Sequence, residues 1–332
     1  MYGEADIVIK VQAPCNGNEG EPDEVKLLRS GSILVGMLAP LSAPENVGPI
    51  ADAGVTSFAM ELIPRISRAQ SMDVLSSQSN LTGYKAVIDA AAHINGLFPM
   101  MMTAAGTIPP ARVMVLGVGV AGLQAIATAQ RLGAIVSATD VRAATREQVE
   151  SLGGSFVMVE DEDMENAETE GGYAKEMSED FKRRQAVLVH ETLKKQDIAI
   201  TTALIPGRPA PVLITREMVA DMKPGSVIVD LAVEAGGNCE ASVPGEIVEV
   251  DGVTIMGRLN VPSLLAADAS LLYARNILNF LKPLVGESGA NLDIDWADQI
   301  VSETLLTRDG AIVNPRLVEQ AGSEELAKQE GS

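Results

Sequence analysis

The alternation of apolar and polar positions is clearest in the middle of the chain, where it predicts strand, helix and strand in turn. Residues 112–116 are typical of a buried strand, and residues 122–132 have the spacing of a helix. Gly133 ends that helix, and residues 134–139 form the next apolar strand. The pattern therefore predicts a βαβ unit with two parallel strands.

Further short apolar segments continue this pattern toward the C-terminus. A helix is expected at 144–152, and strands are expected at 155–159, 197–203, 227–231 and 253–256. With the two strands above, these segments give a set of strands separated by helices, which is the content of a doubly wound parallel sheet.

The N-terminal region of the chain has its own α/β alternation. Strands are expected at 5–11, 32–38 and 56–60, and short helices at 23–29 and 46–53. The last stretch of the chain is expected to return to this first region.

Two longer segments with helical spacing, 82–95 and 264–284, are expected to bridge two domains. The fold class predicted is α/β, with two Rossmann-like α/β domains, the second a doubly wound parallel-sheet dinucleotide-binding domain. The first domain is assigned to residues 1–81 and 285–332, and the NAD-binding domain, with its bridging helices, to residues 82–284.

Composition and charge limit the classes of partner and the compartment that are expected. The 332 residues carry a net charge of −20, which disfavours nucleic acid and an anionic membrane surface. Cys15 and Cys239 show no metal or redox spacing, so a reducing, cytoplasmic compartment is expected. No apolar run approaches the ~20 residues that span a bilayer, and the acidic N-terminus does not resemble a signal peptide.

The strongest chemical signal is Gly117-Val118-Gly119-Val120-Ala121-Gly122, a G-x-G-x-x-G turn between the predicted strand and helix. Its glycines allow a tight turn, close approach of a pyrophosphate, and packing of helix on strand. Asp140, at the end of the next strand, can accept hydrogen bonds from the adenosine ribose and would repel a 2′-phosphate. The pattern predicts a dinucleotide site that prefers NAD to NADP; the alternative is an ordinary turn with a solvated aspartate.

A second dense polar stretch covers residues 64–80. Arg65 and Asp73 have the charges to pair, and Gln70 and Ser76 can present amide and hydroxyl groups to a carboxamide. The alternative is a helix capped by Ser71 or Asp73, with an ordinary ion pair.

An acidic stretch interrupts the second domain. Residues 160–180 hold ten acids and one basic residue, Lys175, around Gly171-Gly172-Tyr173. The stretch is either a disordered insertion or a flap, hinged at the glycines, that lowers Tyr173 onto a ligand.

Several of these segments occur in the same order in one known family: 64–71, the 117–122 turn, Thr139-Asp140-Val141-Arg142, 171–175 and 201–211. On them, the chain closely resembles the NAD(H)-binding domain I of proton-translocating nicotinamide nucleotide transhydrogenases, in the form of a separate alpha-subunit polypeptide. The resemblance implies direct hydride transfer (Si-specific, Re-type) from NADH here to NADP⁺ on a partner subunit, coupled to proton translocation by a membrane-spanning partner. Such transfer needs apposed rings but no acid or base, and no Ser/His/Asp or metal-ligand cluster is visible in the sequence.

The resemblance also implies roles for residues. It implies that Arg65, Gln70, Asp73 and Ser76 surround the nicotinamide, where they are both catalytic and cofactor-binding residues. The remaining cofactor-binding residues implied are Gly117, Gly119, Val120, Gly122, Asp140, Val141, Arg142, Gly172, Tyr173, Gln185, Ala203 and Leu204.

The main alternative is an alanine dehydrogenase-like amino-acid dehydrogenase. That family binds pyruvate with a lysine and a histidine, and Gln12 and Met37 stand in their places here. A carbonyl substrate would lose its charged partner and its proton donor. An NAD-sensing module without activity would leave the 65–76 stretch without a role.

The resemblance further implies a homodimer, held at the inner face of the cytoplasmic membrane by partner subunits. Family members begin some tens of residues earlier, so the first domain is expected to be N-terminally incomplete.

Overall fold

The computed structural model describes residues 2–17, 22–159, 178–205, 207–286 and 291–319. The chain forms two compact units: Met1–Ser77 with Ser270–Ser332, and Gln78–Ala269. We call these unit 1 and unit 2. The domain breaks expected from the sequence lay after residue 81 and before residue 285, whereas both breaks between units fall earlier, inside helices α2 (Val74–His93) and α7 (Ala266–Leu281).

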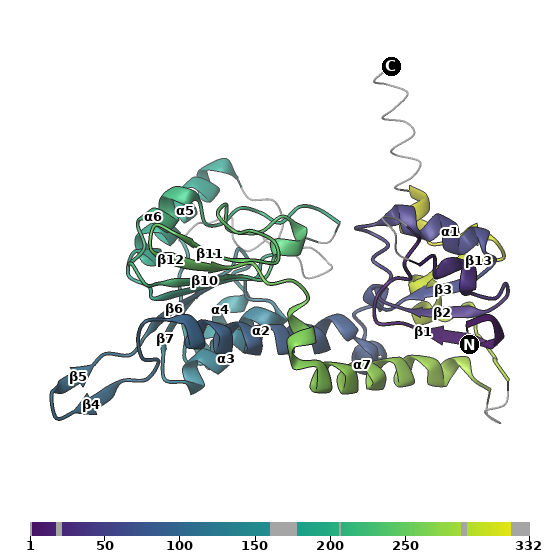
Figure 1. Ribbon diagram of the computed structural model, residues 1–332, viewed down its shortest axis with the longest axis horizontal. Coiled ribbons are helices and arrows are strands. Elements are labelled where there is room, and N and C mark those ends of the chain that lie inside the picture. Colours follow the sequence, from purple (N-terminus) through teal and green to yellow (C-terminus); the bar gives the residue numbers. More distant parts are fainter. Residues whose placement is uncertain (1, 18–21, 160–177, 206, 287–290, 320–332) are drawn as a thin grey trace, which may run out of the picture. The chain divides into compact units, whose positions relative to one another are not determined.

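Unit 2 is built on a seven-stranded sheet (Figure 1). The spatial order is β11 (Ile247–Val250), β12 (Val253–Met256), β10 (Val227–Asp230), β9 (Ile198–Thr201), β6 (Arg112–Leu116), β7 (Ile135–Thr139) and β8 (Ser155–Phe156). The chain winds outward from β6 through β7 to β8 and then from β9 through β10 to β12, with all these pairs parallel. The predicted doubly wound parallel sheet is confirmed, and the antiparallel edge strand β11 is an addition to it.

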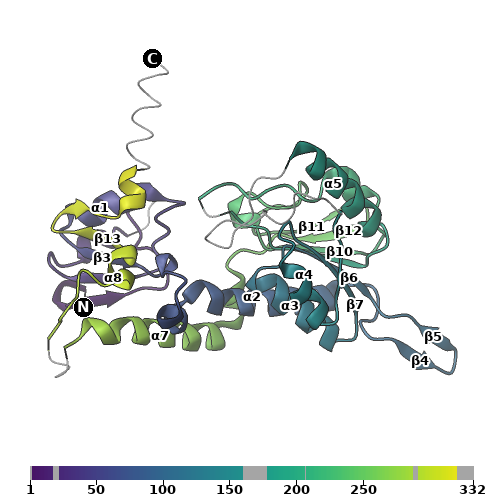
Figure 2. The ribbon, with the colours of Figure 1, turned by 180° about the vertical axis from the view of Figure 1, so that it is seen from behind.

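Alternate residues of each central strand face opposite layers of helices. Val113 and Val115 of β6 join a core with α2 and α3 (Val120–Arg131), whereas Met114 and Leu116 join a core with α5 (Glu179–Leu193) and α6 (Arg216–Ala220). Figures 1 and 2 show these helices on the two faces of the sheet. Both faces are therefore buried, which explains why the strands appear in the sequence as continuous apolar runs.

Two features of the chain between residues 74 and 108 differ from expectation. The helix expected at 82–95 begins eight residues earlier, at Val74, because the polar run 76–80 hides its helical periodicity. A hairpin of β4 (Met101–Thr103) and β5 (Gly106–Ile108) was not expected, and its residues are all exposed. The helix expected at 144–152 is confirmed as α4 (Thr145–Ser151).

Unit 1 contains a five-stranded sheet in the order β1 (Ile7–Ile9), β2 (Ile33–Gly36), β3 (Thr56–Ala59), β13 (Leu305–Arg308) and β14 (Ala311–Ile312). The first three strands are parallel, and β13 pairs antiparallel with β3. The expected return of the chain's last stretch to the first region is thus confirmed.

Helices cover both faces of this sheet. Leu34 of β2 packs with α1 (Val47–Asp52), and its neighbours Ile33 and Val35 pack with α7 and α8 (Gln299–Thr304). The helix expected at 23–29 is wrong in extent, since only the single 3-10 turn Val25–Leu27 forms there.

Candidate functional site

The glycine turn lies where the sequence placed it, between β6 and α3. Gly117 has φ +100°, and a Cβ atom built on it would lie 2.7 Å from Thr202 Oγ1. The Gly117 amide donates to the carbonyl of Thr139 in the neighbouring strand, at 2.9 Å. The turn therefore needs glycine here, for conformation and for space.

The other two glycines have the separate uses that the motif predicts. Gly122 is buried, and a Cβ atom on it would lie 2.0 Å from the Gly117 carbonyl oxygen. A Cβ atom on Gly119 would meet nothing within 4 Å, and Gly119 offers no side-chain cap to α3. The first amides of α3 are therefore open to an anion, next to a residue that leaves room for one.

Asp140 closes the turn from the end of β7. Its Oδ2 accepts from the Val118 amide at 2.7 Å, and its Oδ1 accepts from the Arg142 amide at 2.9 Å. The Arg142 guanidinium adds two more bonds, from Nε to Oδ1 at 2.9 Å and from Nη2 to Oδ2 at 2.8 Å. Four donors thus surround a carboxylate whose side chain is 7% exposed.

These contacts decide the charge of Asp140. Burial alone would raise the pKa of this carboxyl, but the hydrogen bonds from Arg142 and Val118 outweigh burial and hold the pKa below its usual range. Asp140 is therefore an anion at neutral pH, fixed beside the phosphate turn.

The end of β9 completes this group, since β9, β6 and β7 are adjacent in the sheet. Thr202 Oγ1 donates to the Gly117 carbonyl at 2.9 Å. Ala203 is held by Asn238, whose Oδ1 accepts from the Ala203 amide and whose Nδ2 donates to the Ala203 carbonyl, both at 2.9 Å. Leu204 follows with half of its side chain exposed. The arrangement lies at the point where the winding of the sheet reverses, which is where nucleotides bind in such folds.

Asn238 is a residue that sequence reasoning missed. It is fully buried, and its backbone amide donates to Asp230 Oδ2 at 2.9 Å. Asp230 is also fully buried and accepts from Thr201 Oγ1 at 3.0 Å. The contacts cross 35 and 29 positions of the chain, and no motif or spacing marks them.

Gln185 lies on α5, and its side-chain amide forms hydrogen bonds with other residues of unit 2. Its Oε1 accepts from the Val159 amide at 2.9 Å, and its Nε2 donates to Thr139 Oγ1 at 2.8 Å. It thus joins the end of β7 to the segment that follows β8, next to Asp140. Val141, which follows Asp140 in the sequence, is half-buried, while Gly172 and Tyr173 lie outside the described residues.

The four residues expected at the nicotinamide lie together in unit 1, on the segment that follows β3. Arg65 and Gln70 are exposed, and Gln70 belongs to the 3-10 helix Ser67–Met72. Asp73 stands at the start of α2, where its Oδ1 accepts from the Ser76 amide at 2.9 Å and its Oδ2 from Ser76 Oγ at 2.6 Å. The capping role weighed for Asp73 is confirmed.

Comparison with known proteins identifies the family. The models "Alanine dehydrogenase/PNT, N-terminal domain" and "Alanine dehydrogenase/PNT, C-terminal domain" match residues 1–82 and 86–315. An NAD(P) transhydrogenase alpha-subunit polypeptide of Rhodospirillum rubrum is 63% identical over 96% of this chain and 82% of that protein. This chain belongs to the NAD(P) transhydrogenase alpha-subunit family.

A solved structure and a more distant relative agree with this placement. The transhydrogenase from Sinorhizobium meliloti has 52% identity and a TM-score of 0.83, over 94% of this chain and 82% of that one. The alanine dehydrogenase of Halomonas elongata is only 29% identical, over 98% of this chain and 81% of that protein. The transhydrogenase interpretation is therefore favoured over the alanine dehydrogenase alternative.

Unit 1 of this transhydrogenase-family chain is consistent with that distinction. Gln12 and Met37 follow β1 and β2, at the carboxyl ends of two paired parallel strands. Both side chains are uncharged, so they supply neither the cation nor the proton donor that a keto-acid substrate requires. Among the residues that the structure describes, no helix has the length and apolarity needed to cross a bilayer.

Proposed function

We propose that this chain is the NAD(H)-binding subunit of a proton-translocating nicotinamide nucleotide transhydrogenase. Hydride passes directly, and with Si-specific, Re-type stereochemistry, between NADH on this chain and NADP⁺ on a partner subunit. A membrane-spanning partner couples the transfer to proton translocation. The observation that carries the proposal is the 63% identity to a transhydrogenase subunit over nearly the whole chain.

The geometry of unit 2 supports a dinucleotide. The open space at Gly119 and the uncapped start of α3 suit a pyrophosphate, and the residues Gly117, Val120 and Gly122 form the same turn. The anionic Asp140 opposes a 2′-phosphate, which favours NAD(H) on this chain and leaves NADP(H) to the partner. Arg142, Val141, Gln185, Ala203, Leu204, Gly172 and Tyr173 complete the proposed cofactor-binding set.

The proposed hydride transfer requires the side chains to position the nicotinamide and does not require them to donate or accept a proton. The nicotinamide supplies the hydride chemistry when bound, and the protein has to hold one ring face open toward a second ring. Gln70 presents an exposed amide suited to a carboxamide, and Arg65, Asp73 and Ser76 shape the loop around it. No proton has to be moved at the reacting carbon, so no general acid or base is assigned.

The proposal includes the assembly. The partners are the NADP(H)-binding and membrane-spanning transhydrogenase subunits, and a second copy of this chain makes a homodimer. We place the chain at the inner face of the cytoplasmic membrane, held there by those subunits. The word "subunit" in the names of its relatives supports a multichain complex.

Substitution of Gln70 by Asn tests the proposed role of the loop. Shortening the amide by one methylene leaves NADH affinity within about twofold and lowers the hydride-transfer rate of the assembled complex at least tenfold, on the order of what misplaced reacting groups cost. NADH binding is measured by fluorescence titration, with NADPH as the nucleotide control. Gln299→Asn, at an exposed position on α8, is the matched variant and leaves both quantities unchanged. Equal losses of affinity and rate in Gln70→Asn would contradict the role.

A further inference from the structure

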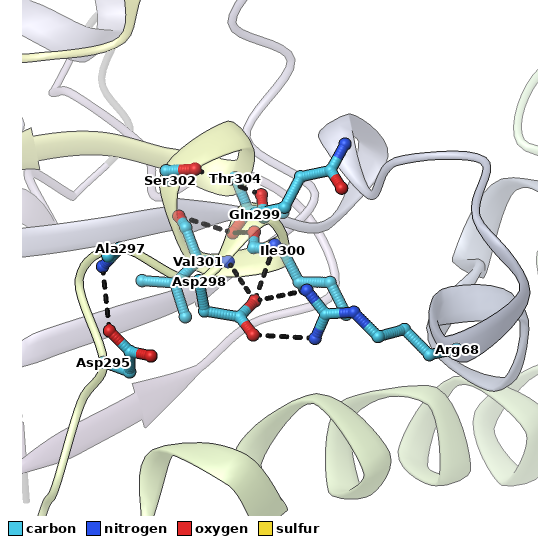
Figure 3. Close-up of polar contacts among 9 residues, drawn as sticks. All are labelled: Arg68, Asp295, Ala297, Asp298, Gln299, Ile300, Val301, Ser302 and Thr304. Atoms are coloured by element: carbon cyan, nitrogen blue, oxygen red, sulfur yellow. Dashed lines mark hydrogen bonds and ion pairs between the residues drawn. The ribbon is translucent and has the colours of Figure 1, made fainter.

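The segment that carries Gln70 is tied to a distant region of unit 1 by an ion pair. Arg68, in the 3-10 helix Ser67–Met72, donates from Nη1 to Asp298 Oδ2 at 2.7 Å and from Nη2 to Oδ1 at 3.0 Å (Figure 3). Two parallel bonds between a guanidinium and a carboxylate fix orientation as well as distance. The pair therefore restrains the direction of the 3-10 helix, and not only its position.

Asp298 is itself held in place. It precedes α8, and its Oδ1 accepts from the amides of Ile300 at 2.7 Å and Val301 at 3.4 Å (Figure 3). Hydrogen bonds from Arg68 are the main cause of a pKa below the usual range for Asp298, so its carboxylate is charged at neutral pH. The anchor is thus a fixed anion on a helix whose Ile300 and Val301 are buried in the core.

A second attachment lies on the other side of Gln70. The Ser71 carbonyl accepts from Asn276 Nδ2 at 2.9 Å and from Asn279 Nδ2 at 3.2 Å, both on α7. The side chains of Ala69 and Met72 are buried in the same core as α7 and α8. Gln70 is therefore an exposed residue between anchored neighbours.

We propose that Arg68 and Asp298 are positioning residues for hydride transfer, because their ion pair fixes the 3-10 helix that presents Gln70 to the nicotinamide. The inference rests on the proposed function and deepens it by assigning residues that touch neither nucleotide. Such a clamp sets the rate of transfer and not the affinity for NADH, since small displacements of reacting groups cost rate.

Asp298→Asn is the decisive substitution, because Asn is as good a helix cap as Asp but has one acceptor oxygen in place of two, so it cannot form the two parallel bonds with a guanidinium. In the chain alone, we expect faster hydrogen exchange at the amides of residues 67–72 and an unchanged NADH affinity. In the complex with its partner subunits, the NADH-to-NADP⁺ transfer rate is expected to fall about tenfold. Arg68→Gln has the same effect, and Arg68→Lys, which keeps the charge, recovers some of the rate.

The double variant tests whether Arg68 and Asp298 act through their mutual contact or independently. Arg68→Gln with Asp298→Asn is expected to be about tenfold slow, not a hundredfold, because either single change already breaks the contact. The matched control is Asp23→Asn, which breaks a different ion pair of unit 1, between Lys26 Nζ and Asp23 Oδ2 at 2.8 Å, whose carboxylate has a similar exposure to that of Asp298. It leaves the exchange of residues 67–72 and the transfer rate unchanged.

Three results would overturn the inference: unchanged exchange in Asp298→Asn, faster exchange with an undiminished transfer rate, or an equal loss of rate in Asp23→Asn. Absence of transfer in the complex with the unaltered chain would instead overturn the proposed function. The two failures are therefore distinguishable.

Discussion

The phosphate turn of unit 2 and the 65–76 segment of unit 1 are built in opposite ways. The contact that closes the turn joins Val118 to Asp140, only 22 positions apart. The contact that orients the segment joins Arg68 to Asp298, 230 positions apart. The residues that form and close the turn therefore lie near one another in the sequence. The orientation of the segment depends instead on a contact with a residue near the C-terminal end of the chain.

The difference extends to the kind of residue that matters. Steric demands dominate the turn, because any side chain at Gly117 or Gly122 would meet backbone atoms or the hydroxyl of Thr202. Polar attachments dominate the segment, through Asp298 and Asn276. Substitutions in the turn should therefore cost stability as well as binding, and those in the segment should cost mainly rate.

The largest effect is expected from Gly122→Ala. Its Cβ atom would lie 2.0 Å from the Gly117 carbonyl oxygen, so α3 or the turn has to shift, at a cost of about 3 kcal/mol and with loss of NADH binding. Gly119→Ala is the matched control, because its Cβ atom meets nothing within 4 Å. It is expected to stay within about 1 kcal/mol of the parent in stability and to weaken NADH binding about tenfold, as a methyl group narrows the approach of a pyrophosphate. Urea unfolding and NADH titration measure the two effects; equal stability of both variants would contradict the steric account.

A smaller effect, with a pH signature, is expected from Asp140→Asn. The amide cannot accept from all four donors, so unit 2 loses about 2 kcal/mol at pH 7. Because hydrogen bonding holds the pKa of Asp140 below its unfolded value, the carboxylate stabilises the fold above about pH 4 and this contribution fades as the pH falls through the folded pKa.

The measurement for Asp140 is the difference in unfolding free energy between parent and variant as a function of pH. The difference should be largest near neutral pH and shrink below about pH 4. Asp180→Asn, which removes an exposed carboxylate from α5 in the same unit, should show a difference below about 1 kcal/mol throughout. If the difference in unfolding free energy between parent and Asp140→Asn increased on acidification, the conclusion that folding lowers the pKa of Asp140 would be wrong.

The same contrast explains what the sequence could predict. The strands of unit 2 are apolar on both faces, so β6, β7, β9, β10 and β12 were predicted at nearly their observed positions. The start of α2 was missed because Ser76, Ser77 and Gln78 give no apolar stripe, although Asp73 carried a capping signal. Asn238 and Asp298 could not be found, since their partners are determined only when the sheet and helices have assembled.

The smallest effect concerns Asp73, where the two interpretations of the 65–76 segment meet. Asp73→Ala removes the acceptor of the Ser76 amide at the start of α2 and should cost about 1 kcal/mol. Asp73→Asn keeps a capping oxygen and should cost only about a few tenths of a kcal/mol. Urea unfolding of the two variants measures the cap by itself.

The hydride-transfer rate of the complex then distinguishes a helix-capping role of Asp73 from a role in the reaction. If Asp73→Asn retains stability and NADH binding but loses transfer, the carboxylate acts on the nucleotide or on its neighbours in the loop, as the proposed site requires. If Asp73→Asn transfers hydride at the parent rate while Asp73→Ala is slowed in step with its loss of stability, Asp73 is a helix cap alone. The site would then rest on Arg65, Gln70 and the Arg68–Asp298 pair, and Asp73 would contribute to the stability of α2 without contributing to hydride transfer.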